Sequence, residues 1–315
     1  MDWVREGMTL TADTVGRPLF MLAESEFHNV ARGGQTWRYA DSGQGPVVVL
    51  IHGFPDTPQS YAGIARALND AGYRTIVPYL RGYHPDTLVP DRPYDALHLA
   101  EDAIGLLDAL ELKSAVFVGH DWGATLVWGA ASLAPDRVDG IVPIAIPHPR
   151  TLKPKNALQA VGLLIMARHF LYFRVPWAEA GTRRGNFRYI DSLYRRWAPA
   201  WKGPERDAAL ARAKEAFSTP EILEASIVYY RALGSKIDRR LLGPIACSGL
   251  LVAGGRDFGG HLGPYKKSQG LLGGGAELLV MPEAGHWPHR EEESQFTDAL
   301  LGFLGGLREK EHSRS

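Results

Sequence analysis

The chain has 315 residues, of which 45% are hydrophobic and 22% are charged, a composition typical of a globular protein with a large core. Its 35 basic and 35 acidic residues balance, so no strong field would draw nucleic acid or a membrane surface. Cys247 is the single cysteine, which excludes an intrachain disulfide; we expect a buried structural thiol and a cytoplasmic protein. Met1–Glu6 does not read as a signal peptide, and the uncharged stretch Asn156–Ala167 is shorter than the ~20 residues that span a bilayer.

The first half of the chain alternates between predicted strands and helices. Strands around Glu26–Arg32 and Gln35–Ala40, joined by a pair of glycines, predict a hairpin. Val47–Ile51 is apolar throughout, as in a strand that is buried on both faces. The next expected elements are a helix over Ser60–Ala71, a strand over Arg74–Val77, a helix over Tyr94–Leu110, a strand over Ala115–Val118, a helix from Ala124 and a strand over Val138–Ile146.

From residue 148 to 240 the chain reads as helical, with breaks at prolines and glycines. Strands then follow at Gly249–Ala253 and Glu277–Met281, before a final helix over Glu291–Leu304. We therefore expect an α/β fold, in which residues 1–147 and 241–315 form a mostly parallel sheet with helices on both faces and residues 148–240 form a helical cap. Ligands bind at the carboxyl ends of such strands. Arginines of the cap region are expected to form a solvated face: Arg168, Arg174, Arg183, Arg184, Arg188, Arg195 and Arg196.

Asp121 is the most informative residue of the chain. It is the centre of Gly119-His120-Asp121-Trp122-Gly123, which joins an apolar strand to a predicted helix. The glycines fit a sharp turn that presents the central side chain, because side chains beside it would clash. A serine is usual at this position, so a carboxylate indicates attack on a saturated carbon with an ester intermediate rather than acyl transfer. The alternative role is a carboxylate that caps the following helix.

Four segments together resemble the α/β-hydrolase fold family, and within it the branch of epoxide hydrolases and haloalkane dehalogenases. They are His52-Gly53-Phe54-Pro55-Asp56, Gly119-His120-Asp121-Trp122-Gly123-Ala124, Gly254-Gly255-Arg256-Asp257 and Gly285-His286-Trp287. The resemblance implies that Asp121 is the nucleophile, that His286 is the base that activates water, and that Asp257 orients this histidine. It implies hydrolysis of an apolar epoxide to a vicinal diol without a cofactor.

The resemblance also implies supporting roles. The backbone N–H groups of Phe54 and Trp122 would stabilise the oxyanion, aided by a cis bond before Pro55. Two cap tyrosines, Tyr230 and Tyr172, would protonate the epoxide oxygen, with Tyr229 as the rival of Tyr230. Residues expected to contact the substrate are His52, Pro55, Trp122, Tyr229 and Trp287.

Two other functions stay open at this point. Dehalogenation uses the same triad but needs N–H donors for the halide, such as Trp122 with Trp177, Trp197 or Trp201; Phe54 stands where dehalogenases often carry asparagine. The chain could instead be a binding protein on the same fold. The segment Pro78–Pro85 departs from the Asp-x-Arg-Gly-Tyr-Gly of many relatives. His52, His120, His148 and His286 show no metal-ligand spacing, so we expect no metal; the partner is a small apolar molecule and the protein a monomer or homodimer.

Overall fold

The computed structural model describes residues 21–89, 91–152, 168–233, 237–257 and 261–313. The expectations for Met1–Glu6 and Asn156–Ala167 lie outside this part of the chain. No helix within these ranges is both long and apolar enough to cross a membrane.

Eight strands of the described residues form a single sheet in the order β1-β2-β4-β3-β5-β6-β7-β8. The strands are β1 (Phe27–Arg32), β2 (Gln35–Ser42), β3 (Val47–Ile51), β4 (Arg74–Pro78), β5 (Ala115–His120), β6 (Val138–Ile144), β7 (Ser248–Gly254) and β8 (Ala276–Met281). β2 runs antiparallel to both of its neighbours, and the other pairs are parallel. The expected hairpin and mostly parallel sheet are therefore confirmed, and the parallel strands end along one edge.

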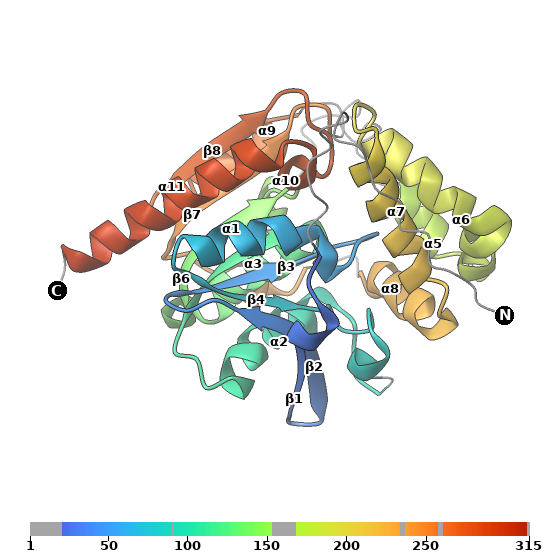
Figure 1. Cartoon of the computed structure of the whole chain (residues 1–315), viewed down its shortest axis with the longest axis horizontal. Helices are drawn as coiled ribbons and strands as arrows, with labels where there is room; N and C mark the ends of the chain where they lie inside the picture. Colours follow the sequence, from blue (N-terminus) through green and yellow to red (C-terminus); the bar gives the residue numbers. More distant parts are fainter. Residues whose placement is uncertain (1–20, 90, 153–167, 234–236, 258–260, 314–315) are drawn as a thin grey trace, which may run out of the picture.

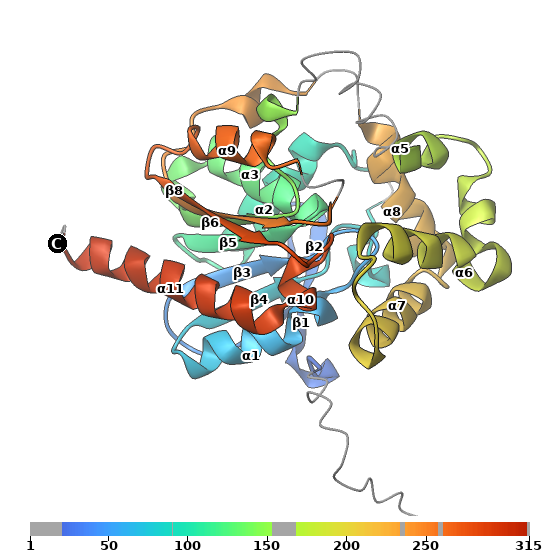
Figure 2. The same cartoon turned by 90° about the horizontal axis from the view of Figure 1, so that it is seen from above.

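Helices cover both faces of the sheet (Figure 2). One face carries α1 (Ala62–Asp70) and α11 (Glu293–His312), and the other carries α2 (Ala96–Ala109), α3 (Trp122–Leu133) and α9 (Gly263–Gln269). The side chains of β3 alternate between these layers: Val48 and Leu50 pack with the core of the first, Val49 and Ile51 with that of the second. Burial on both faces explains why this strand is apolar throughout.

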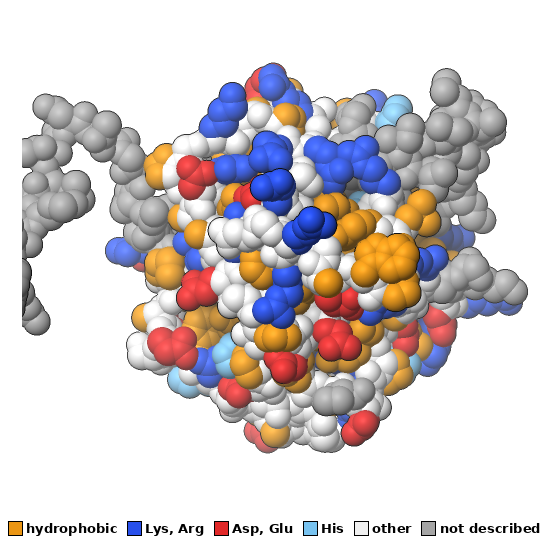
Figure 3. All heavy atoms as spheres, turned by 90° about the vertical axis from the view of Figure 1, so that its right-hand side faces the viewer, with side chains coloured by type: hydrophobic (Ala, Val, Ile, Leu, Met, Phe, Trp, Pro, Cys, Tyr) orange, Lys and Arg blue, Asp and Glu red, His pale blue; other side chains and the backbone are white. Residues whose placement is uncertain are grey.

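Four further helices lie together beyond one end of the sheet (Figure 1). They are α5 (Arg168–Phe173), α6 (Ala178–Trp197), α7 (Pro204–Ala216) and α8 (Pro220–Ala232), and we call them the cap helices. All seven arginines predicted to form a solvated face are exposed. Lys and Arg side chains are spread over this side of the molecule among hydrophobic ones (Figure 3).

Some elements differ from the sequence-based expectation. The helix expected over Ser60–Ala71 starts as a 3-10 turn, and the last helix is divided at residue 292 into α10 (Pro288–Glu291) and α11. Helix α9 was not expected; it begins with Gly263-Pro264, and proline suits the first turn of a helix. The 3-10 turns are η1 (Glu24–Glu26), η2 (Pro58–Tyr61), η3 (Pro85–Thr87), η4 (Pro135–Arg137), η5 (Pro149–Thr151) and η6 (Arg239–Leu242).

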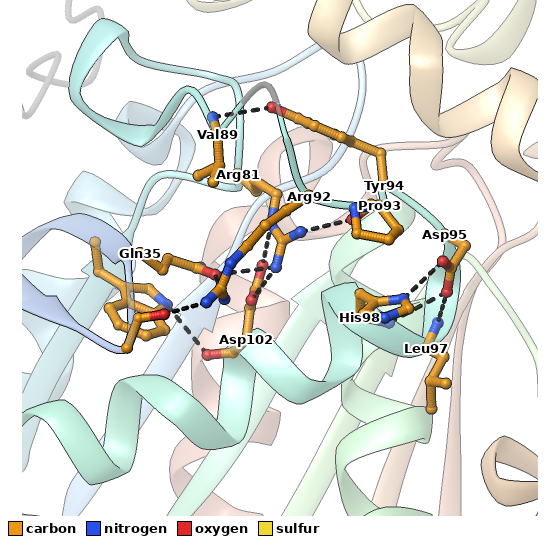
Figure 4. A network of polar contacts seen from close by, with 12 residues as sticks. Gln35, Arg81, Val89, Arg92, Pro93, Tyr94, Asp95, Leu97, His98 and Asp102 are labelled. Atoms are coloured by element: carbon orange, nitrogen blue, oxygen red, sulfur yellow. Dashed lines mark hydrogen bonds and ion pairs between the residues drawn. The ribbon is translucent and has the colours of Figure 1, made fainter.

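The loop after β4 is anchored by a buried arginine (Figure 4). Arg81 is 5% exposed and forms an ion pair with Asp102 of α2, with 2.7 Å between Arg81 Nε and Asp102 Oδ2. Its other nitrogens donate to Pro93 O at 2.6 Å and to Gln35 Oε1 at 3.0 Å. A guanidinium with this many partners fixes the loop that follows β4.

Candidate active site

Asp121 occupies a strained turn between β5 and α3. Its backbone angles are φ 52° and ψ −113°, a conformation that L residues rarely adopt. A Cβ on Gly123 would lie 2.2 Å from Ile51 O, and one on Gly119 would lie 2.3 Å from Gly123 O. Glycine is therefore required at both positions, as the sequence predicted. Asp121 caps no helix with its side chain, which removes the alternative role.

The structure brings together Asp121, His286 and Asp257 at the carboxyl edge of the sheet. Asp121 Oδ2 lies 3.4 Å from His286 Nε2, and His286 Nδ1 lies 2.9 Å from Asp257 Oδ2. The imidazole is fully buried, whereas the side chain of Asp121 is 12% exposed. One histidine thus bridges two carboxylates, one of which is held on the elbow.

The charges of Asp121 and His286 depend on each other. Burial alone would lower the pKa of His286, but Asp257 and Asp121 outweigh burial and raise this pKa to about 10. Burial would raise the pKa of Asp121, but the hydrogen bond and charge of His286 hold this pKa below its usual value. The resting site is therefore a carboxylate beside an imidazolium at neutral pH.

The loop that carries His286 is fixed through its backbone. Glu291 accepts hydrogen bonds from Gly285 N at 2.9 Å and from Trp287 N at 3.1 Å, on either side of the histidine. His286 N donates to Trp197 O at 2.8 Å, and His286 O lies 2.7 Å from His120 Nε2. The sequence did not reveal Glu291, the last residue of the four-residue helix α10, whose carboxylate reaches back to the backbone before that helix.

Phe54 N donates to Asp121 Oδ1 at 2.9 Å, as expected for an oxyanion donor. The bond between Phe54 and Pro55 is cis, which confirms that expectation. Trp122 is the first residue of α3, where backbone N–H groups have no partner within the helix. Oδ1 thus accepts from the Phe54 N–H, while Oδ2 faces the histidine.

Adjacent tyrosines of α8 have different hydroxyl environments. Tyr229 donates to Arg81 O at 2.6 Å, so its hydroxyl is committed to the loop after β4. Tyr230 is 1% exposed, and its hydroxyl has no hydrogen-bond partner among the described residues. Its ring lies 5.4 Å from Phe54 and 5.3 Å from Trp122. Burial raises the pKa of Tyr230 well above its usual value, and the charge of Asp121 raises it further. The Trp122 side chain lowers this pKa, but by less.

The structure does not bring Tyr172 to this place. Its ring stacks on Tyr189 with 4.0 Å between centroids, and a Cβ on Gly181 would lie 2.5 Å from its hydroxyl. The hydroxyl therefore points to the start of α6. His169, on the same short helix, instead contacts Tyr230, with 5.5 Å between ring centroids. Of the two cap tyrosines that were expected to act together, the structure therefore places Tyr230 against Phe54 and Trp122, and α5 turns His169 toward Tyr230.

Three residues that were expected to contact the substrate are engaged within the protein. His52 Nε2 accepts from Leu80 N at 3.2 Å and its Nδ1 lies 3.0 Å from Gly53 O, so both ring nitrogens support backbone. Burial lowers the pKa of His52 to about 4, which keeps it neutral. Pro55 O accepts from Tyr194 at 3.0 Å, and the Trp287 ring stacks on Tyr194 at 4.4 Å. Pro55 and Trp287 therefore join the core to the cap helices.

A family model described as the alpha/beta hydrolase fold matches residues 46–293. The chain belongs to the α/β-hydrolase fold family. Among curated relatives of this α/β hydrolase, epoxide hydrolase 2 of Siraitia grosvenorii is 38% identical over 89% of this chain and 98% of its own. Epoxide hydrolase A of Mycobacterium tuberculosis is 30% identical, with 88% and 97% covered. The crystal structure of epoxide hydrolase A from Mycobacterium thermoresistibile is 26% identical with a TM-score of 0.74, covering 89% of this chain and 98% of that one.

These similarities confirm the resemblance that the four sequence segments indicated. The relatives match over most of their length, so the similarity includes the cap region as well as the sheet. The α/β hydrolase is therefore an enzyme of the hydrolase class.

A buried polar cluster behind His286 was not foreseen. Ligand atoms of Asp56, His120 and His289 lie within 4.8 Å of one another. Burial raises the pKa of Asp56 to about 6 and lowers that of His120 to about 3. The charge of the buried Arg290 acts to lower the pKa of both Asp56 and His289. The His286 ring lies 4.8 Å from the His120 ring. The positive charges of Arg290 and of a protonated His286 would oppose a further cation, which disfavours metal binding at this cluster.

Proposed function

We propose that the protein hydrolyses an apolar epoxide to a vicinal diol through a covalent ester on Asp121. The observation that carries this proposal is the carboxylate on the elbow, with Oδ1 on the Phe54 N–H and Oδ2 beside His286. A carboxylate held in this way is a nucleophile for a saturated electrophilic carbon. Similarity to enzymes named epoxide hydrolases supports the choice of electrophile.

In the first step, Asp121 Oδ2 forms a bond to an epoxide carbon while the carbon–oxygen bond of the ring breaks. The leaving oxygen takes the proton of the Tyr230 phenol, whose hydroxyl is otherwise unengaged among the described residues. A phenol with a raised pKa holds its proton until an alkoxide, which is more basic, develops beside it.

Esterification removes the negative charge of Asp121. Because that charge is one cause of the raised pKa of His286, the pKa falls when the ester forms. The proton that His286 then loses balances the one that Tyr230 gave away. His286 is left neutral, as a base must be, and Asp257 continues to hold its Nδ1.

In the second step, neutral His286 removes a proton from water, whose oxygen attacks Cγ of the ester. The negative charge develops on Oδ1, where each preorganised donor contributes about 3 kcal/mol. The diol leaves with the original Oδ2 and takes the proton from His286. The carboxylic acid left on Asp121 returns its proton to His286, which restores the resting ion pair.

The test compares the wild type with Asp121→Asn, using styrene oxide for diol formation and 1-bromobutane for halide release. We expect diol from the wild type, no halide and no turnover by the variant. With excess enzyme in water labelled with oxygen-18, the label should enter Asp121 and not the diol of the first turnover. Halide without diol would favour a dehalogenase, and inactivity toward both would favour a binding protein.

A further inference from the structure

Arg231 joins three of the cap helices at one point. It follows Tyr230 in α8, and its guanidinium donates from Nε to Phe173 O at 3.0 Å and from Nη2 to Val175 O at 3.2 Å, where α5 ends. Its Nη1 and Nη2 also pair with the two carboxylate oxygens of Glu179, in the first turn of α6, at 2.6 and 3.0 Å. A planar guanidinium suits such a bidentate pair, so Arg231 fixes α8 against the end of α5 and the start of α6.

A second arginine makes the reverse connection. Arg174, the residue after α5, donates from Nε to Tyr230 O at 3.4 Å and from Nη2 to Leu233 O. The last carbonyls of a helix have no donor within it, and an arginine side chain can take the place of that donor. Arg174 thus caps the end of α8, while Arg231 caps the end of α5. We call these two residues, together with Glu179, the arginine clamp.

The arginine clamp acts on the backbone of two residues whose rings lie in the candidate active site. The carbonyl of Tyr230 is one of its partners, and the carbonyl of Phe173 is another. The two rings pack on each other with 4.8 Å between centroids, and they lie 5.4 and 5.2 Å from the ring of Phe54. Because Phe54 N donates to Asp121 Oδ1, a continuous chain of contacts runs from the clamp to the nucleophile.

The clamp is better suited to fixing a position than to stabilising the fold. The side chains of Arg231 and Glu179 are 31% and 24% exposed, and ion pairs this near water contribute little to folding. Position is the stricter requirement, since displacing a reacting group by about 1 Å can slow a reaction about 100-fold. The Tyr230 phenol moves with α8, so its place depends on the contacts that fix this helix.

We infer that Arg231 is a positioning residue, which holds Tyr230 where its hydroxyl can give a proton to the epoxide oxygen. This inference rests on the proposed function. Arg231 gives no proton itself and acts through α8, with Glu179 and Arg174 as the other members of the clamp. The first step of the reaction uses the Tyr230 proton and the second does not. Loss of the clamp should therefore slow ester formation and leave ester hydrolysis unchanged.

The inference is tested by rapid-quench measurement with styrene oxide, which separates formation of the Asp121 ester from its hydrolysis. Arg231→Met keeps an unbranched apolar side chain but removes the N–H donors, and we expect ester formation to slow by about 10- to 100-fold. Ester hydrolysis should keep the wild-type rate. Arg231→Lys can still pair with Glu179 and should recover part of the loss. Arg184→Met, which removes an exposed arginine outside the clamp, is the control and should behave as wild type.

A double-mutant cycle separates positioning from packing. Arg231→Met should slow ester formation much less in a Tyr230→Phe background than in the wild type, because that background has no phenol proton to position. An equal loss in both backgrounds would show that Arg231 acts independently of the Tyr230 hydroxyl and would overturn the inference. Equal slowing of both steps, with no recovery in Arg231→Lys, would show a packing role and do the same.

Two further outcomes are decisive. Normal ester formation by Arg231→Met would overturn the inference and leave the proposed function intact. If Arg231→Met does not fold, Arg231→Lys takes its place in the cycle, and the same results would contradict positioning. Failure of the wild type to open any epoxide would instead overturn the proposed function, and the inference with it.

Discussion

At the scale of single residues, two neighbouring tyrosines of α8 differ in how their hydroxyls are bonded. Tyr229 satisfies the buried carbonyl of Arg81, while the Tyr230 hydroxyl has no such partner among the described residues. Adjacent residues of a helix point about 100° apart, so one phenol can support the loop after β4 while the other faces Asp121. Their substitutions should therefore have opposite effects on stability and activity.

We expect Tyr229→Phe to lower the free energy of unfolding by about 1–3 kcal/mol, because the Arg81 carbonyl loses its donor in a buried site. Tyr230→Phe removes a buried hydroxyl with no partner in the described chain, so its stability should match or exceed that of the wild type while ester formation slows. Urea denaturation and rapid-quench kinetics on both variants measure the two effects. A stable, active Tyr229→Phe beside an unstable Tyr230→Phe would contradict the assignment.

Glu291 should matter for the second step of the reaction. Replacing Glu291 by glutamine exchanges one acceptor for an amide donor that faces a backbone N–H, so the His286 loop loses a hydrogen bond worth about 1–3 kcal/mol. Ester hydrolysis should slow more than ester formation, because in the proposed mechanism His286 acts as a base in the second step. Glu292→Gln, the same change one residue later, is the control and should leave both steps unchanged.

The features that the sequence predicted well are backbone conformations that depend on local geometry. Asp121 and the cis bond before Pro55 belong to short segments in which a few neighbours determine the backbone. The choice between Tyr172 and His169 could not be made in this way, since it depends on how a six-residue helix is rotated against α8. Asp56, His120 and His289 are far apart in the sequence, and only the fold brings them together.

At the scale of elements, the elbow depends on how closely α3 approaches β3. Ile51 O lies so close to Gly123 that even a methyl group at this position would overlap with it. The helix therefore begins directly against the strand, with Trp122 as its first residue after Asp121.

Gly123→Ala should lower the free energy of unfolding by at least about 3 kcal/mol, because the new methyl group would meet backbone that is fixed by the sheet. Gly302→Ala is the matched control: nothing described lies within 4 Å of the new Cβ in α11, so alanine should stabilise the helix by about 0.5–1 kcal/mol. Thermal unfolding of both variants measures the difference. Equal stability of the two would contradict the tight approach.

Element types were easier to predict than element ends. The continuous apolar run of β3 and the glycine-flanked turn after β5 are sequence patterns that are typical of one kind of element each. In contrast, α6 contains four residues with non-helical angles, Arg184 to Phe187, where the chain turns within one helical stretch. Gly185 and Asn186 tolerate the positive φ angles of this turn, but the hydrophobic pattern by itself does not indicate it.

At the scale of the whole molecule, the ion pair in the site contributes to stability in a pH-dependent way. The pKa of His286 is about 10 in the fold and near 6.5 in an unfolded chain. A base whose pKa is raised by folding stabilises the fold fully below its unfolded pKa. This contribution is lost as the pH rises through the folded pKa. The relevant window is therefore from pH 6.5 to 10.

Across this window, the free energy of unfolding should fall more steeply for the wild type than for His286→Gln, by at most about 1.4 kcal/mol per pH unit. Urea denaturation at several pH values from 6 to 10 measures both slopes. Other titrating groups are common to the two proteins, so the difference isolates the histidine. Parallel curves would mean that His286 is neutral in the resting enzyme.

The hydrogen bond from His286 N to Trp197 O bears on the engineering of chimeras. Trp197, the last residue of α6, accepts from the backbone N–H of His286, and a Cβ on Gly285 would lie 2.3 Å from the same carbonyl oxygen. Cap helices from another protein, grafted onto this sheet, would therefore transfer that protein's substrate preference only if they supplied a backbone carbonyl at the position of Trp197 O. Any mismatch there would displace the histidine, so recombination breakpoints should keep Trp197 with the recipient sheet.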